Sequence, residues 1–489
     1  MSGNTGIGNR LYRNKSILGQ GFKENYFEIL IISIFIALEI FSLALLYYNS
    51  YLLILFILAV VFIYLFFTFP EFSLITLFLI PITKGTLEEN YIVFQTIDLT
   101  VVSIILLVFA VFLKYLKGEI KINIIKEFPQ VFLSFIFLTL VVMAGGLYTP
   151  AFDSGLYKAG RWLVFNVTIF LTALALLQSQ DSSQRFLKLL GFSAVIVAGM
   201  LLYKLFEYFL QGQITIYILR LSVLNANPIG VARLISIGTV IFFIYANYVD
   251  RRLIKYFLYS ITIFLFVGLL STASRGPFLS LIVGLIAFAF IFSQIKNVRL
   301  FANGFGIILV IGIIFILMPE EMVRRYLVFS QMDATVNYNG TIQQTSTIHD
   351  RLNMWLLCLS TSVDSLKNLL IGLGTGGFSS LFIIRDFRFY PHNIFFEILV
   401  ELGLVGLSFF IWHIVSIYNK TKDIYKKMIP HKDKYFTMWV ISCITFFTAT
   451  QFSGNINDNR LLWVFIAGML SYGIEMTNNS NFAVYGKKF

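Results

Sequence analysis

The sequence predicts an all-α protein that crosses a membrane about 14 times, and about 12 times at the least. Three observations predict this class. Of the 489 residues, 58% are hydrophobic and only 13% are charged, whereas soluble domains carry about 25% charged residues. The mean hydropathy of the chain is +0.82. Apolar runs long enough to cross a hydrocarbon core of about 30 Å recur from end to end.

The predicted spans follow one another with short connections until late in the chain. In order they are 27–48, 51–69, 72–83, 97–116, 129–148, 161–179, 186–210, 229–248, 254–271, 277–293, 300–318, 394–418, 436–453 and 460–475. Segment 72–83 is short for a full crossing, so a half-span or a re-entrant helix remains open there.

Basic residues predict the orientation. Alternation across fourteen spans places both termini and 23 of the 37 Lys and Arg residues on one side. Because basic residues mark the cytoplasmic side, both termini are expected in the cytoplasm. This placement accounts for the net charge of +12, so nucleic-acid binding loses its support. The two cysteines are too few for a disulfide framework.

The expected organisation is one membrane domain with a single large external loop. Its parts are a cytoplasmic tail 1–26, eleven spans in 27–318, the external loop 319–393, three spans in 394–475 and a second cytoplasmic tail 476–489. The first tail is polar and basic and lacks the short apolar core of a signal peptide. A loop as long as 319–393, without a disorder-type composition, is usually functional.

Several arginines lie at the predicted external ends of spans. Arg161 begins "RWLVFNVTIF", Arg233 lies one turn into a span, and Arg275 sits in "STASRGPFLS", a tight hairpin between two spans. Arginine within the hydrocarbon costs about 2.5–3.5 kcal/mol, so these side chains are expected to face a cavity or a partner. For Arg161, snorkelling toward the interface is equally open. The constrained turn around Arg275 favours ligand binding.

A guanidinium presents a planar fork of donors that engages two phosphate oxygens at once. Arginines gathered at the outer boundary of a membrane therefore suggest that the ligand is a phosphate or diphosphate carried by a lipid.

Within the large loop, "STIHDRLNMWLLCLSTSVDSL" has the apolar spacing of an amphipathic helix that Ser346 or Asp350 caps. Arg351 and Trp355 lie four residues apart, so they share a face of this helix. A second short helix is expected over 363–370. The glycines of "GLGTGGF" follow no strand, which argues against a nucleotide loop. They indicate tight turns or a close approach of the backbone to a ligand.

At the seam between this loop and the next span, the chain reads "RFYPHNIFFEILVELGLVG". His392 is a candidate general base, because histidine titrates near neutral pH. The alternative is that His392 and Asn393 cap the following helix. Glu397 and Glu401 lie four apart on that helix and could both face the cavity, or Glu401 pairs with a neighbouring helix. No cluster with metal-ligand spacing is evident on this face.

Four stretches together resemble the O-antigen ligase and polymerase superfamily: "SRGPFL" (274–279), "HDRLNMW" (349–355), "GLGTGGF" (372–378) and "PHNIFFEILVELGLVGL" (391–407). The resemblance covers 229–418. It implies a fold similar to the C-type glycosyltransferase membrane fold. It also implies inverting transfer of glycans from an undecaprenyl diphosphate carrier, without a metal or other cofactor. The site would face the periplasm or exterior of a bacterial inner membrane.

The resemblance also implies roles for individual residues, and further arginines are added because of their position on the external side. His392 is expected to be catalytic, and the expected diphosphate ligands are Arg275, Arg351, Arg233 and Arg388. The expected supporting residues are Asn393, Glu397, Trp355 and Arg161.

Three functions compete. The favoured one is a polymerase that joins lipid-linked oligosaccharide repeat units into a surface polysaccharide such as O-antigen or capsule. Its expected partners are the undecaprenyl-diphosphate-linked oligosaccharide, membrane lipid and other polysaccharide-assembly proteins. The alternative is a ligase that moves finished glycan to lipid A core or another acceptor. A solute or lipid transporter is third, supported by the number of spans and by Pro81 within an apolar segment.

Overall fold

The computed structural model of the chain describes a large part of the sequence. The described residues are 63–90, 96, 98–120, 122–211, 221–291, 333–336, 342–345, 347–382, 389–428 and 433–485. The predicted spans 27–48 and 300–318, most of 51–69, and Arg388 lie outside them. The chain divides into two units, Met1–Thr68 and Phe69–Phe489, and the fold described below is that of the second unit.

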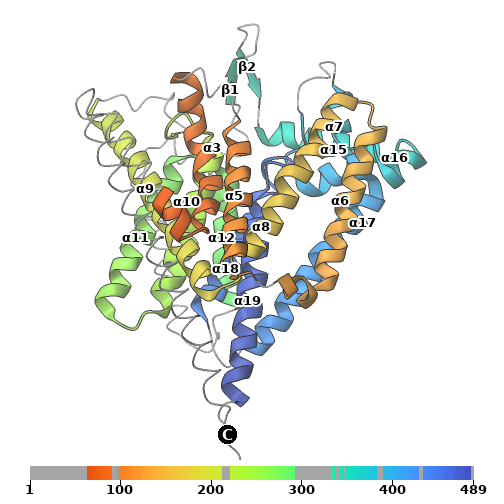
Figure 1. Cartoon of the computed structure of the whole chain (residues 1–489). Coiled ribbons are helices and arrows are strands. Elements are labelled where there is room, and N and C mark those ends of the chain that lie inside the picture. Colours follow the sequence, from red (N-terminus) through yellow and green to blue (C-terminus); the bar gives the residue numbers. More distant parts are fainter. Residues whose placement is uncertain are drawn as a thin grey trace, which may run out of the picture. The chain divides into compact units, whose positions relative to one another are not determined.

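The described part of the second unit is almost entirely helical (Figure 1). Its elements are α3 Phe72–Asn90, α5 Leu99–Leu116, η1 Ile122–Glu127, α6 Pro129–Tyr148, α7 Phe152–Arg161, η2 Trp162–Val167, α8 Thr168–Leu176, α9 Gln180–Leu210, α10 Pro228–Tyr248, α11 Arg252–Ser271, α12 Arg275–Ile291, β1 Asp333–Val336, β2 Ile342–Thr345, α15 Thr347–Val363, α16 Leu366–Ile371, η4 Gly377–Leu381, α17 Ile394–Met428, α18 Lys434–Ala449 and α19 Leu461–Tyr485.

Seven helical stretches among the described residues are long and apolar enough to cross a membrane: α5, α6, the continuous stretch Phe152–Leu176, α9, α10, α11 and α17. Helix α12 is apolar but shorter. The predicted class, an all-helical membrane protein, is therefore confirmed in outline. The strands β1 and β2, which pair antiparallel within the 319–393 loop, were not predicted.

Helix ends differ from the predicted spans where polar residues continue a helix. The span predicted at 394–418 is the first part of α17, which runs on to Met428. The added residues, "NKTKDIYKKM", include several lysines, which are good helix formers. Apolar runs mark only the part of a helix that suits the membrane. In the same way α3 continues past the predicted end at 83 to Asn90, with Pro81 inside it.

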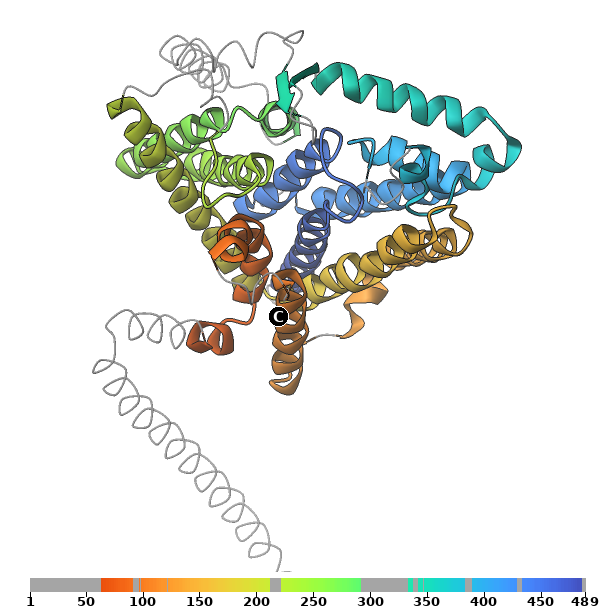
Figure 2. The same ribbon diagram turned by 90° about the horizontal axis from the view of Figure 1, so that it is seen from above.

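Helix α19 lies in the interior of this unit, packed against α8, α17 and α18 (Figure 2). Its Trp463 is 2% exposed and sits 5.0 Å from the ring of Phe135 and 5.6 Å from that of Trp162. These three rings join α19 to α6 and to η2. Rigid aromatic contacts of this kind fix the helices whose ends build the site.

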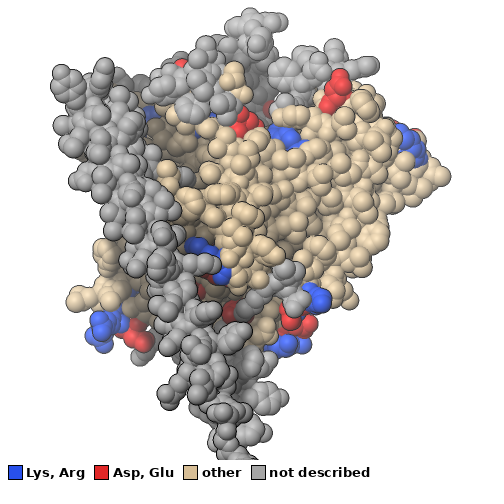
Figure 3. Space-filling model, viewed as in Figure 1, with Lys and Arg blue, Asp and Glu red and all other residues tan. Residues whose placement is uncertain are grey.

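Outward-facing positions are apolar instead of polar. Ile105, Phe112, Leu140 and Phe257 are all more than half exposed, which in water would be an unfavourable hydrophobic surface. Figure 3 shows a wide uncharged band over α6 and α17, with charged groups above and below it. This distribution matches a lipid-facing surface.

The 319–393 loop packs onto the first turns of α17. Cys358 of α15, Phe378 of η4 and Val400 of α17 form one buried cluster, which Met354, Leu357 and Phe396 extend. Part of the loop is thus anchored on the helix that follows it.

Glycines allow this loop to meet α17 backbone to backbone. Gly403 has φ +63°, and a Cβ there would lie 2.4 Å from the carbonyl carbon of Leu370. Gly372 has φ +71°, and a Cβ there would lie 2.4 Å from that of Glu401. The kink at Gly403 interrupts the helical hydrogen bonds, and the loop supplies replacements: Leu373 N donates to Val400 O and Gly374 N to Glu401 O. For the glycines of "GLGTGGF" the sequence predicted tight turns or a close approach to a ligand, and at Gly372 the close approach found is to the protein's own backbone.

Candidate active site

The site begins at the first turn of α17. Asn393 caps this helix, since its Oδ1 accepts hydrogen bonds from Phe395 N at 2.9 Å and Phe396 N at 3.2 Å. His392 does not take part in capping the helix, because its Nδ1 is buried and has no hydrogen-bond partner among the described residues. His392 also has φ +60°, a backbone conformation that is uncommon for a residue with a side chain. The histidine is thus held in an uncommon conformation and left with an unsatisfied nitrogen.

Helix α15 fixes the segment that carries His392. Trp355 Nε1 donates to Pro391 O at 2.8 Å, and its ring stacks on Phe396 at 5.3 Å between centroids. On the other side, the ring of Tyr390 lies 4.4 Å from that of His392. The predicted supporting residue Trp355 therefore holds the backbone next to His392.

Positive charge gathers around His392. Burial and the nearby Arg351 charge lower the pKa of His392 to about 4, against a smaller opposite effect of Asp458. Burial lowers the pKa of Arg351, and Arg275 lowers it further while Tyr390 opposes this. Arg351 is thus close enough to act on His392, and Arg275 is close enough to act on Arg351. At neutral pH the imidazole is uncharged and able to accept a proton.

Arg275 is the first residue of α12, after a turn in which Ala273 has φ +49°. The hairpin predicted at this position is present. A Cβ on the adjacent Gly276 would lie 2.9 Å from Cβ of Phe452, so the start of α12 packs tightly on the turn after α18. This packing holds the Arg275 backbone firmly.

Arg233 has structural partners. Its NH2 donates to Ala449 O at 3.1 Å and to Ser453 O at 2.7 Å, and its guanidinium lies over the ring of Phe446. These carbonyls belong to the end of α18 and the turn beyond it, so Arg233 caps that helix. Its Nε is buried and has no hydrogen-bond partner within the ranges that the structure describes.

A buried ion cluster joins Lys158 of α7 to two glutamates in the first turns of α17. Lys158 Nζ is 2.6 Å from Glu397 Oε1 and 2.7 Å from Glu401 Oε2. The remaining oxygen of Glu397 accepts from Ile456 N at 2.9 Å, and Glu401 also accepts from Gly376 N at 2.9 Å. Both carboxylates are almost fully buried. Glu397 therefore joins α7, α17 and the 454–460 loop, and Glu401 pairs with the neighbouring helix α7.

Lys158 was missed by the sequence reasoning. The signal available was a pair of glutamates at i and i+4 in an apolar helix, because buried carboxylates need a cation. Nothing in the sequence says which lysine supplies it, since Lys158 lies 239 residues from Glu397.

A π-helical turn, η2, positions the 454–460 loop. Asn166, fully buried in η2, donates to Asn457 Oδ1 at 2.7 Å and accepts from Trp463 Nε1 at 2.9 Å. Asn457 in turn donates to Lys158 O at 2.9 Å. Helical turns of this kind are frequent at functional sites. Here the turn directs a buried amide at the loop that contacts Glu397.

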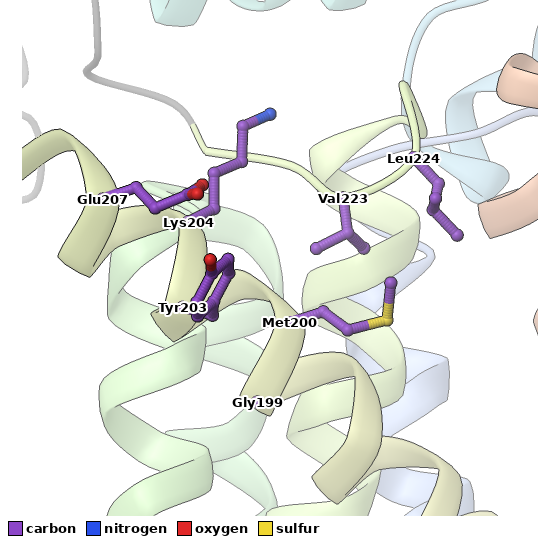
Figure 4. Close-up of a pocket in the computed structure, with 7 residues that line it drawn as sticks. All are labelled: Gly199, Met200, Tyr203, Lys204, Glu207, Val223 and Leu224. Atoms are coloured by element: carbon purple, nitrogen blue, oxygen red, sulfur yellow. The ribbon is translucent and has the colours of Figure 1, made fainter.

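A separate pocket of about 830 Å³, counting the solvent at its mouth, lies between α9 and residues 223–224. Figure 4 shows Met200, Tyr203 and Lys204 beside Val223 and Leu224. Lys204 Nζ donates to Ser222 O at 3.1 Å, which ties it to the protein. None of the predicted site residues lines this pocket. Among the described residues, no group of three His, Cys, Asp or Glu could hold a metal ion.

The fold and site define a polytopic helical membrane protein with a cationic site at one end of its helices. A family model described as O-Antigen ligase matches residues 260–411, from within α11 to within α17. This match supports membership of the O-antigen ligase and polymerase superfamily. It indicates an enzyme of polysaccharide-related glycan transfer. A comparison with curated proteins finds no matching relative.

Proposed function

We propose that the protein is an inverting membrane glycosyltransferase that polymerises undecaprenyl-diphosphate-linked repeat units into a surface polysaccharide. The observation that carries the proposal is the buried Nδ1 of His392, which has no hydrogen-bond partner among the described residues and lies near the charge of Arg351, on which Arg275 acts in turn. The proposal includes a C-type glycosyltransferase fold, about 14 spans, and a site that faces the periplasm or exterior of a bacterial inner membrane.

The diphosphate binds between the arginines. A diphosphate brings several negative charges, and a guanidinium fork satisfies two of its oxygens at once. Arg275 starts a tightly packed helix and Arg351 lies on α15, so both groups are held before the ligand arrives. Preorganised cations stabilise the charge that develops on a departing diphosphate. Arg233 and Arg388 are proposed as further ligands of the same group.

The chemistry then needs one proton transfer. A hydroxyl of the acceptor sugar attacks the anomeric carbon, and the bond from that carbon to the diphosphate oxygen breaks with its electron pair going to the diphosphate. His392 accepts the hydroxyl proton at its unbonded nitrogen. The lowered pKa keeps the imidazole neutral before substrate binds. The bound diphosphate then stabilises the imidazolium, because an opposite charge favours the charged form.

A ligase that passes finished glycan to lipid A core or another acceptor is the second candidate. It is favoured by the description of the matching family model, O-Antigen ligase. The residues around His392 serve either reaction equally well, because both use the same donor and an attacking hydroxyl. The acceptor separates the two.

The test uses purified protein in liposomes with lipid-diphosphate repeat units, and resolves the products by size. A ladder that remains on the carrier lipid supports polymerisation, whereas products that form only after a second acceptor is added support ligation. Arg275→Lys and Arg351→Lys are each expected to slow the reaction about tenfold or more, because lysine cannot form the bidentate contact. Full activity of both variants would contradict diphosphate binding by these residues.

A further inference from the structure

A second basic pair lies apart from Arg275 and Arg351. The guanidinium of Arg161 lies 5.1 Å from the ring centre of Phe165, and that of Arg460 lies 5.7 Å from the same centre. In both residues Nε is buried without a hydrogen-bond partner. Within the described part of the chain, no carboxylate forms an ion pair with either guanidinium. The charge of Asp458 acts on Arg460, so of the two it is Arg161, with no ion pair among the described residues, that favours an anion from outside the protein.

Arg161 also lines a narrow cleft next to the reaction centre. The cleft itself encloses about 50 Å³, or about 440 Å³ with the solvent at its mouth, and its lining includes Ser154, Tyr157, Tyr390 and Asn455. Tyr390 is the residue whose ring lies 4.4 Å from His392. One end of the cleft is thus a single side chain away from the proposed base.

The lining has the chemistry of a sugar site. Tyr157, whose ring the Arg161 guanidinium covers at 5.5 Å, and Tyr390 give the lining the aromatic character that suits a pyranose ring, and Ser154 and Asn455 are polar groups suited to its hydroxyls. Lys158 also lines the cleft, but its charge is paired with Glu397 and Glu401. Arg161 is therefore the cation that remains for the ligand. One fork suits a single carboxylate, while a diphosphate calls for several cations.

We propose that this cleft is a subsite for a sugar residue that carries a carboxylate, with Arg161 binding the carboxylate. The inference rests on the proposed function, because it places an acidic sugar of the repeat unit beside the sugar that reacts. Arg460, which also lies over the ring of Phe165, supports it by adding positive potential. The specificity for an acidic repeat unit then lies in α7.

The experiment measures binding without catalysis. The full-length protein in lipid nanodiscs is titrated with methyl β-glucuronide and with methyl β-glucoside, and binding is followed by saturation-transfer difference NMR. The glucuronide is expected to bind about tenfold or more tightly than the glucoside, because its carboxylate gains a charge-assisted bond. Arg161→Gln is expected to abolish this preference, and Arg161→Lys to keep part of it.

Lys204→Gln is the matched control, since it removes one positive charge from the pocket of Figure 4 and should leave the preference unchanged. Equal binding of the two glycosides, or a preference that survives in a folded Arg161→Gln variant, would overturn the inference. So would pyrophosphate that binds more tightly than the glucuronide and loses that binding in Arg161→Gln. A missing polysaccharide ladder with intact glucuronide binding would count against the proposed function and leave the subsite standing.

Discussion

Two polar clusters sit within three turns of one helix and differ in one respect. Around Glu397 and Glu401, all four carboxylate oxygens have partners in the protein. At His392, the ring nitrogen Nδ1 is buried and finds no hydrogen-bond partner in the described part of the chain, with the charge of Arg351 nearby. Buried polar groups are normally satisfied, and an unsatisfied one needs an explanation.

This difference indicates that the Lys158 cluster has a structural role and that the His392 cluster binds a ligand. The Lys158 cluster gains nothing from a ligand, and it joins α7, α17 and the 454–460 loop. The His392 cluster is incomplete within the described residues, because they give its Nδ1 no hydrogen bond and the charge of Asp458 has a smaller effect on the histidine than that of Arg351. A ligand with negative charge and a proton to lose completes it. Changes at His392 should therefore lower activity more than stability, whereas changes in the Lys158 cluster should lower stability first.

The largest effect is expected for His392→Ala. Loss of the proton acceptor should lower turnover by about 10²–10⁴-fold in the ladder assay, while the unfolding temperature changes little because the ring nitrogen has no partner. The matched variant is Asn393→Ala, which removes the helix cap and should cost about 1 kcal/mol of stability. Equal losses of activity in the two variants, at equal stability, would show that His392 is only structural.

Lys158→Met should affect stability first. It leaves two buried carboxylates without their cation, which costs about 3–5 kcal/mol, so thermal unfolding of the detergent-solubilised variant should shift strongly downward. Adding Glu397→Gln and Glu401→Gln to Lys158→Met should recover part of the loss. If Lys158→Met unfolds like the wild type, the cluster is not the scaffold described here.

Gly403→Ala should cost less. Alanine at φ +63° is strained by about 1–3 kcal/mol, and its Cβ would meet the Leu370 carbonyl. Gly230→Ala in α10 is the comparison, because nothing lies within 4 Å of a Cβ there. Thermal unfolding of the two variants should rank Gly403→Ala as the less stable. The reverse order would contradict the crossing of α16 and α17.

The smallest effect is a displacement of pH profiles. In the free enzyme His392 has a pKa of about 4, so kcat/KM should fall only as the pH drops through about 4, where the imidazole gains a proton. The bound diphosphate raises this pKa, so the acid limb of kcat should lie at higher pH. Identical acid limbs, or limbs unchanged in His392→Gln, would argue against proton transfer to His392.

The sequence predicted what local patterns encode. The apolar runs marked the membrane helices, and the spacing around Trp355 marked α15, found at Thr347–Val363. The β1–β2 hairpin also had a local signal that was not used: Asn339-Gly340 stands between two short β-prone runs, as in tight hairpins.

The side-chain contacts that the sequence could not predict are those between residues far apart in the chain. Whether His392 or Asn393 capped α17 was open, because both types suit a helix start, and only the geometry assigned the cap to Asn393. The pairing of Lys158 with Glu397 and the meeting of Arg161 with Arg460 over one ring join residues hundreds of positions apart. No periodicity in a single chain encodes such contacts.

A structure of the protein with undecaprenyl diphosphate bound in a nanodisc tests the central claim most directly. Diphosphate oxygens within hydrogen-bonding distance of the guanidinium groups of Arg275 and Arg351, with His392 facing the adjacent space where a sugar hydroxyl would enter, is the predicted result. A diphosphate bound elsewhere, with His392 Nδ1 still buried and unpartnered, would contradict it.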